Sequence, residues 1–103
     1  MTNTITRQRI EVLVDSPLVQ RILDAAESAG VTGYTMLPTL GGLGQSGHWA
    51  DDQVSGAASK VLFITVTNEK KAAALIDALT PLLESHSFVL FRSNVEVVRG
   101  DRF

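Results

Sequence analysis

Segments with the period of a β-strand alternate along this chain with segments that have the period of an α-helix. Apolar and β-branched residues dominate residues 9–14 (RIEVLV) and 60–67 (KVLFITVT), as in strands. Each of these segments is followed by apolar side chains at helical spacing. Strand-like runs also occupy residues 34–40, 88–91 (FVLF) and, briefly, 95–99 (VEVVR). The pattern predicts one helix after the first strand and another after the third.

Both predicted helices carry signals at their ends. Asp15 or Ser16 is placed to cap the first helix, and Gly30 to end it. Asn68 can cap the second helix, whereas Pro81 is expected to strain or end it because proline lacks the N–H that a helix interior needs. The predicted buried stripes are Leu18, Val19, Ile22, Leu23 and Ala26 in the first helix, and Ala72, Leu75, Ile76 and Leu79 in the second.

The order strand, helix, strand, loop, strand, helix, strand is typical of the ferredoxin-like split βαβ arrangement (βαββαβ), an α+β fold. A chain of 103 residues suits one core, so we expect a single domain over residues 1–103. Two helices cover only one face of a four-stranded sheet. The other face, with side chains from VLFITV and FVLF, would leave a large apolar patch exposed in a monomer. We therefore expect an oligomer that buries it.

Composition excludes several classes of function. Nine Lys and Arg residues against eleven Asp and Glu give a net charge of -2, which does not indicate nucleic-acid binding. The chain has no cysteine, so disulfides and thiolate chemistry are excluded. Its apolar runs are far shorter than the roughly 20 residues that span a bilayer, and its N-terminal residues lack the apolar core of a signal peptide. The default expectation is a cytoplasmic protein.

Residues 41–47 (GGLGQSG) hold four glycines in seven positions. Glycine inside a regular element costs up to about 1 kcal/mol relative to alanine, so we expect an irregular loop that bends sharply or approaches a ligand closely. Consecutive N–H groups without side chains form a concave donor site, so an anion is the expected ligand. Trp49 closes this segment, and the polar run 50–59 follows it.

Two nucleotide-binding motifs share this glycine spacing, but neither fits. A dinucleotide-binding fold needs a helix that starts on the loop, whereas residues 48–52 (HWADD) have no helical period. A phosphate-binding loop needs Lys and then Ser or Thr where His48 and Trp49 stand. His48 beside Asp51 and Asp52 would make at most a weak metal site, and a solvated loop position is favoured for His48. His86 is interpreted in the same way. No catalytic constellation emerges, so we expect a protein that is not an enzyme.

Residues 29–35 (AGVTGYT), the glycine-rich stretch ending in QSGH at 45–48, and Lys60-Val61 resemble consecutive segments of the PII family of signalling proteins. Residues 88–91 and 95–100 are similar to the last two strands of that family. The resemblance covers most of the chain in the same order. Within the family, the short loop looks most like the carboxysome-associated PII-like proteins and, less closely, the bicarbonate-transporter regulators called SbtB.

The resemblance implies a homotrimer with an adenine nucleotide in each of three clefts between subunits. Thr35 and the backbone around Val66 would contact the adenine, and the base of the flexible T-loop, here about residues 41–59, would contact the phosphates. Residues 100–103 would form a C-terminal tail. The residues implied for the nucleotide are Thr35, Gly41, Gly42, Gly44, Gln45, Gly47, Lys60, Val66 and Arg99. In the carboxysome-associated type bicarbonate binds beside the nucleotide, and its implied contacts are Gly44, Gln45, Ser46, Gly47 and Arg99.

The sequence departs from the family pattern in several places, and these departures change which modification and which nucleotide are expected. The tyrosine-bearing part of the T-loop is largely missing, so uridylylation is not expected. The glycine- and lysine-rich loop before the fourth strand is reduced to residues 84–87 (ESHS), and Val97 replaces one of two closing arginines. With fewer counter-charges, ADP or AMP is expected in preference to ATP.

The resemblance also implies that the T-loop signals inorganic-carbon or energy status to a partner protein from the carboxysome or from bicarbonate transport. Two other classes of function stay open. One is a nucleotide-independent trimeric adaptor that binds a protein partner through the Trp49 loop. The other is a ferredoxin-like enzyme or metal-binding domain. Without the resemblance, Thr35 and Lys60 would be ordinary strand residues and Arg99 a surface arginine.

Overall fold

A computed structural model describes residues 3–44, 47–50 and 59–98 of the chain. A long first strand leads through a short 3-10 helix (Ser16–Leu18) into α1, and a second helix precedes the last strand. The elements in chain order are β1 (Thr4–Asp15), α1 (Val19–Ser28), β2 (Thr35–Pro38), β3 (Gly41–Gly44), β4 (Gly47–Ala50), β5 (Lys60–Thr67), α2 (Glu69–Ser85) and β6 (Val89–Val98).

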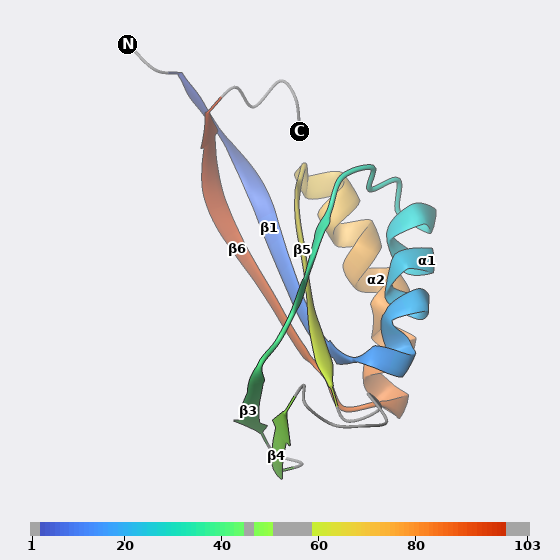
Figure 1. Ribbon diagram of the computed structural model, residues 1–103. Helices are drawn as coiled ribbons and strands as arrows, with labels where there is room; N and C mark the ends of the chain where they lie inside the picture. The colour runs from blue at the N-terminus through green and yellow to red at the C-terminus, as the bar shows by residue number, and fades with distance from the viewer. Residues whose placement is uncertain (1–2, 45–46, 51–58, 99–103) are drawn as a thin grey trace.

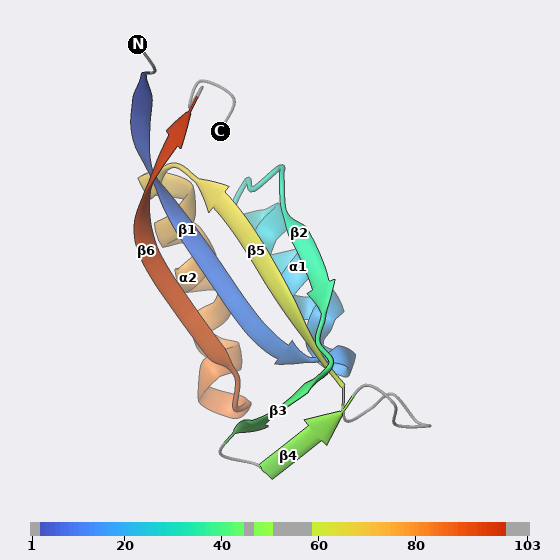
Figure 2. The same ribbon diagram turned by 60° about the vertical axis from the view of Figure 1, so that its left-hand side comes forward.

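Four of the strands form one antiparallel sheet in the order β2-β5-β1-β6. Both helices pack on the same face of this sheet, and its other face is uncovered (Figures 1 and 2). The expected α+β arrangement of a split βαβ fold is therefore confirmed. The small β3–β4 hairpin projects beyond one end of the sheet, next to the start of β5. In the described part of the chain, no helix is long and apolar enough to cross a membrane.

The core lies between the sheet and the two helices. Alternate residues of β1 and β5 face the helices because side chains of a strand point to opposite faces in turn. Val12, Phe63 and Leu75 are examples of side chains that are almost completely buried there. The predicted helical stripes are confirmed: Ile22, Ala26, Ala72, Leu75 and Leu79 are buried, and Leu18, Val19, Leu23 and Ile76 pack against them in part.

Two of the predicted helix boundaries are confirmed by their chemistry. The side chain of Asn68 caps α2, since its Oδ1 accepts a hydrogen bond from the backbone N–H of Lys71 at 2.8 Å. Gly30 follows α1 with φ of 82°, a left-handed conformation that glycine adopts without strain. The predicted capping of the first helix is wrong. The side chain of Asp15 makes no cap, and the Oγ of Ser16 donates to the carbonyl of Ser59 at 3.1 Å.

Pro81 does not end the second helix, which continues to Ser85. Leu79 before it is fully buried, and Leu82 after it packs against the core. This burial outweighs the single backbone hydrogen bond that proline cannot donate.

The last two predicted strands are one strand. β6 pairs continuously with β1, from Leu13 opposite Val89 to Thr4 opposite Val98. The first strand therefore begins at Thr4, earlier than predicted, because this long ladder orders polar residues whose sequence has no strand pattern. The ribbon of β1 and β6 extends past the helices, away from the β3–β4 hairpin (Figure 1).

The glycine-rich segment also differs from its prediction. Residues expected to form an irregular loop pair as β3 and β4, with Gly42 opposite Trp49 and Leu43 opposite His48. Glycine disfavours regular structure, but the hairpin forms here because Trp49 packs closely on Gly42. Any side chain at residue 42 would prevent this contact. Residues 45–46 and 51–58 of the expected T-loop, and residues 99–103 with the expected tail, lie outside the described residues.

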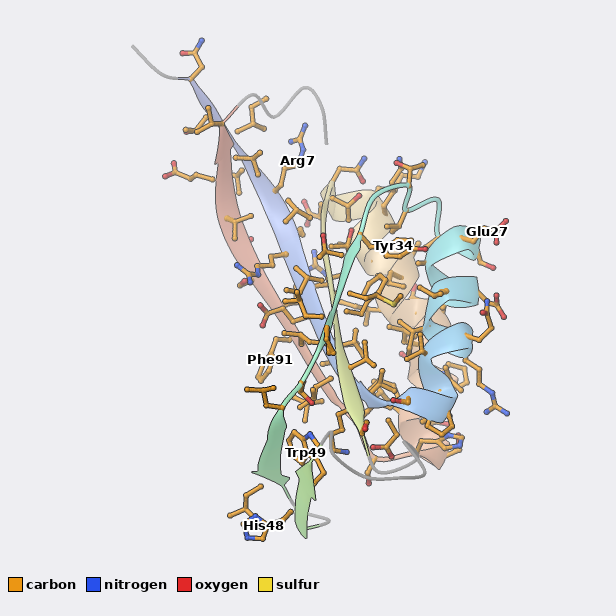
Figure 3. The ribbon with its side chains drawn as sticks, in the orientation of Figure 1. Arg7, Glu27, Tyr34, His48, Trp49 and Phe91 are labelled. Atoms are coloured by element: carbon orange, nitrogen blue, oxygen red, sulfur yellow. The ribbon has the colours of Figure 1, made fainter. Side chains whose placement is uncertain are left out.

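The uncovered face of the sheet is partly apolar, as expected. Leu37, Val89 and Phe91 are large apolar side chains exposed there. Phe91 points away from the helices (Figure 3). Two charged residues of β1, Arg9 and Glu11, form an ion pair of 2.5 Å on the same face.

Candidate functional site

A cavity of about 310 Å³ lies where β2 begins and β5 ends. Thr35 and Val66, which the resemblance assigns to the adenine, both line it. A buried hydroxyl fixes its wall, since Thr65 Oγ1 donates to the carbonyl of Gly33 at 2.6 Å. Lys71 from α2 supplies one cationic group at this cavity, although its sequence position did not predict a site residue. The expected association of Thr35 with Val66 is thus present in the structure.

Tyr34 lies beside this cavity, between β2 and the helices (Figure 3). Its ring stacks on that of Phe63, with the centroids 5.2 Å apart. Offset aromatic pairs of this kind contribute about 0.5–1.5 kcal/mol beyond their buried area. The start of β2 is therefore held by a side-chain stack as well as by the Thr65 hydrogen bond.

A larger cavity, of about 600 Å³, lies at the opposite end of β5. It brings together three predicted ligand residues, Gly44, Gly47 and Lys60, with Trp49. The remaining walls come from β1, the hairpin, the end of α2 and the start of β6. They are mostly apolar and consist of Leu13, Leu43, Leu83, His86, Ser87, Phe88 and Val89. The segment that replaces the family's glycine- and lysine-rich loop thus supplies part of this cavity.

The β3–β4 hairpin owes its shape to the contact between Gly42 and Trp49. A Cβ atom on residue 42 would lie 2.7 Å from Cζ2 and 2.9 Å from Cζ3 of the indole, closer than real side chains approach. Gly47 adopts φ of 104°, which disfavours any residue with a side chain. These two glycines therefore have structural roles in the hairpin, independently of any ligand.

A chain of contacts joins Trp49 to the sheet. The indole Nε1–H donates to Thr39 Oγ1 at 2.9 Å, and Thr39 Oγ1 donates to the carbonyl of Lys60 at 2.8 Å. The Lys60 ammonium lies 5.2 Å from the centroid of the Trp49 ring, a cation–π distance, and 2.6 Å from the carboxylate of Asp15. Lys60, predicted as a ligand residue, is thus engaged within the chain.

Trp49 is the residue that was predicted to contact a protein partner. It is only partly exposed and lies at the base of the hairpin, between Gly42, Thr39 and Lys60 (Figure 3). His48 points outward from the hairpin instead (Figure 3). Within the described residues, no three His, Asp or Glu side chains gather as a metal site. Asp51 and Asp52 lie outside that part.

One chain does not assemble all the predicted residues into one site. Lys60 and Val66 are six residues apart on β5, which corresponds to about 20 Å. Gly41 and Gly42 are in β3 and line neither cavity. Val98, the residue before Arg99, pairs with Thr4 at the end of the β1–β6 ribbon far from Lys60. Gln45, Ser46 and Arg99 themselves lie outside the described residues.

Three residues of these sites, Asp15, Thr39 and Lys71, were not predicted from the sequence. Asp15 was interpreted as a helix cap, the ordinary role of an aspartate before a helical proline. Its contact with Lys60 joins residues 45 positions apart, and Trp49 contacts Thr39 across 10 positions that include the whole of β3. No local pattern in the sequence signals either contact.

Comparison with known proteins finds a family that matches almost the whole chain. The family model described as nitrogen regulatory protein P-II matches residues 7–102. None of the curated protein sequences matches the chain. The solved structure of CPII, a nitrogen regulatory PII-like protein from Thiomonas intermedia K12 bound to ADP, AMP and bicarbonate, is similar over 100% of this chain and 98% of its own. Its TM-score is 0.89 and its sequence identity 23%.

Two further structures are similar to almost the whole chain. CPII bound to ADP, AMP and acetate covers 98% of this chain and 97% of its own, with a TM-score of 0.80 and 25% identity. A PII-like signalling protein from Thermus thermophilus covers 98% of both chains, with a TM-score of 0.81 and 20% identity. At these identities the similarity establishes the fold.

Proposed function

The chain belongs to the P-II family of regulatory proteins, and from this premise we propose that it binds an adenine nucleotide together with bicarbonate. The binding sites are clefts between the subunits of a homotrimer, and ADP or AMP is favoured over ATP. Ligand binding changes the order of the T-loop, which signals to a partner protein. The protein acts as a sensor and performs no catalysis. Its similarity to CPII, which is bound to ADP, AMP and bicarbonate, supports this choice of ligands.

The observation that carries this proposal is the separation of the predicted ligand residues into two cavities. Thr35 and Val66 line one, whereas Gly44, Gly47 and Lys60 line the other, at the opposite end of β5. A ligand that uses both sets needs two copies of the chain, with different ends of the sheet meeting at one cleft. Head-to-tail contacts of this kind form a ring when the rotation between neighbouring copies closes, and a trimer is the smallest ring beyond a dimer.

The uncovered sheet face supports the same assembly. Phe91 is 58% exposed and Val89 43% exposed, although both are large apolar residues. Burial in an oligomer removes such side chains from water, which stabilises the assembly by roughly 25 cal/mol per Å² of apolar surface. The trimer therefore buries this face at its centre and leaves the helices outside.

The preference for fewer phosphates follows from the charges at the larger cavity. Among its described lining residues, Lys60 is the only lysine or arginine, and the remaining walls are mostly apolar. A triphosphate would be left with too few counter-charges. Arg99 from a neighbouring copy adds a guanidinium whose fork geometry suits both phosphate and bicarbonate.

Two ligands in one cleft are coupled, and the coupling is reciprocal. Bicarbonate should therefore tighten ADP binding by the same factor as ADP tightens bicarbonate binding. Such a sensor combines energy status with inorganic-carbon status. Its partner is then a protein of the carboxysome or of bicarbonate transport.

Isothermal titration calorimetry of ADP into the purified protein tests the proposal. Titrations are run with and without bicarbonate at matched pH and ionic strength, and AMP and ATP are compared under both conditions. We expect ADP to bind, bicarbonate to tighten binding, and ATP to bind less tightly than ADP. Binding that is indifferent to bicarbonate would leave a nucleotide sensor without the carbon input. No binding of any nucleotide would contradict the proposed function.

A further inference from the structure

Lys60 lines the larger cavity, but its ammonium already has partners within the chain. The carboxylate of Asp15 lies 2.6 Å away, and the ring centroid of Trp49 lies 5.2 Å away. Asp15 and Lys60 are opposite each other in the β1–β5 ladder, so rigid strands hold their backbones in place. Any exchange of partners at Lys60 can therefore occur by side-chain rotation alone.

The Asp15 carboxylate resembles the ligands proposed for this cavity, because carboxylate, bicarbonate and phosphate are all oxyanions. The Lys60 ammonium is a compact charge on a flexible four-carbon stem, which allows it to turn between acceptors. Its side chain is 19% exposed, and that of Asp15 is 43% exposed. Partly exposed ion pairs of this kind contribute only about 0.2–1 kcal/mol, so a bound anion can displace Asp15.

We propose that Asp15 is an internal competitor for the anion bound in the larger cavity, and that Trp49 responds to the exchange. In the ligand-free protein, the Lys60 ammonium pairs with the Asp15 carboxylate and holds Trp49 through its cation–π contact. When an anion binds in the cavity, Lys60 turns from Asp15 toward it and leaves the face of the indole. This inference rests on the proposed function in one respect, since it takes the ligand to be an anion at Lys60.

Loss of the Lys60 contact leaves Trp49 with two anchors. These are its packing on Gly42 and its hydrogen bond to Thr39. The second anchor still ties the indole to the start of β5, because Thr39 Oγ1 donates to the carbonyl of Lys60 at 2.8 Å. Trp49 therefore has two links to the start of β5, the Lys60 ammonium and this pair of hydrogen bonds. The exchange at Lys60 therefore removes one of these two links and weakens the hold of β5 on the β3–β4 hairpin, which is the base of the T-loop. An anion at the cavity is thus coupled to the loop through named side chains.

Trp49 is the only tryptophan, so its fluorescence reports on this site alone. Acrylamide quenching is measured for the wild type, Lys60→Met and Asp15→Asn, first without ligand. Lys60→Met keeps the apolar stem but removes the charge, and should raise the quenching constant. Lys70→Met, at an exposed position on α2 away from both cavities, is the matched control and should match the wild type. Circular dichroism tests whether each variant is folded. If Lys60→Met does not fold, Lys60→Gln is measured in its place.

ADP with bicarbonate is then titrated into each protein. In the wild type, saturation should raise the quenching constant of Trp49. Asp15→Asn should bind ADP about two- to five-fold more tightly than the wild type, which is the gain expected when a competing ion pair of this strength is removed. Equal or weaker binding by Asp15→Asn would overturn the competition. A ligand-free quenching constant equal to that of the wild type in the folded Lys60 variant would overturn the response of Trp49.

A failure of the proposed function can be distinguished from a failure of the competition by Asp15. If the wild type binds neither ADP nor bicarbonate, the sensor proposal fails, and the competition is tested with inorganic phosphate. Asp15→Asn should then show the phosphate-dependent change in Trp49 quenching at lower phosphate concentration than the wild type. The same midpoint in both proteins, or no change in either, would overturn the role of Asp15.

Discussion

The indole of Trp49 packs against Gly42, its partner across the β3–β4 hairpin, so closely that residue 42 has no room for a Cβ atom. This contact explains why a glycine-rich segment forms a hairpin. The tryptophan supplies the apolar surface that the glycines lack. The hairpin in turn brings Trp49 to Thr39 and to the ammonium of Lys60.

Gly42→Ala should displace Trp49 from the hairpin, because the new methyl group would lie less than 3 Å from the indole. Overpacking of this kind costs about 1–3 kcal/mol, here at the hairpin and not in the core. We expect red-shifted fluorescence and stronger acrylamide quenching. Gly44→Ala is the control, since its Cβ would lie 3.8 Å from the same ring, an ordinary contact. Identical spectra for the two variants would contradict the packing described.

Thr65→Val should lower the free energy of unfolding by about 1 kcal/mol, measured by urea denaturation. The buried hydroxyl donates to the Gly33 carbonyl at 2.6 Å, and valine keeps the shape but not the donor. ADP affinity should also fall, because this bond fixes a wall of the smaller cavity. Thr80→Val, which removes an exposed hydroxyl from α2, should change stability by less than about 0.5 kcal/mol. Similar losses in both variants would contradict a specific role for Thr65.

Asn68→Ala should destabilise the protein by about 0.5–2 kcal/mol, because the N-cap acceptor for the Lys71 N–H is lost. Asn68→Asp keeps an acceptor oxygen and adds a negative charge at the positive end of the helix, so it should retain stability. Thermal unfolding followed by circular dichroism compares them. Equal melting temperatures for the alanine and aspartate variants would show that the cap does not stabilise α2.

Phe91→Glu should dissociate the proposed trimer. It places a charge on the uncovered sheet face, directly opposite Glu11, and like charges at such positions repel. Size-exclusion chromatography with light scattering should give a trimer for the wild type and a smaller species for the variant. Ala74→Glu adds the same charge to an exposed position of α2 and should leave the trimer intact. A trimeric Phe91→Glu protein would show that another surface forms the assembly.

Arg99→Ala should weaken binding of both ADP and bicarbonate. Hydrogen bonds to charged groups contribute about 1.5–3 kcal/mol, so each dissociation constant should rise at least about tenfold. Calorimetry measures both, and Arg21→Ala, at an exposed position of α1, controls for the loss of one positive charge. Unchanged affinities in Arg99→Ala would mean that the anion site has been assigned to the wrong residues.

The class of fold and the buried helical stripes were predicted from the sequence because both depend on periodicity. Val12, Ile22 and Leu75 could be assigned to the core from their spacing, whatever their partners. The helix cap at Asn68 and the end of α1 at Gly30 are also local, since each involves backbone within four residues. Family membership was indicated by motifs such as AGVTGYT, whose order along the chain is a sequence property.

The candidate site was predicted only in part. The structure places Thr35 with Val66 at the smaller cavity, and Gly44 and Gly47 with Lys60 at the larger one. The sequence did not reveal that these groups lie at opposite ends of β5. It also assigned Asp15 to a helix cap, where the structure pairs it with Lys60.

The sequence by itself determined the period of each segment, and through it the α+β order and the side of each helix that is buried. Such information is local, because it resides in the spacing of apolar residues and in the conformations allowed to Gly30 or Asn68. Only the tertiary structure decided that α2 continues through Pro81, that the glycine-rich segment pairs as a hairpin, and that Lys60 meets Asp15 and Trp49. These outcomes depend on contacts between residues distant in sequence, and their energies exceed the local preferences that predicted otherwise.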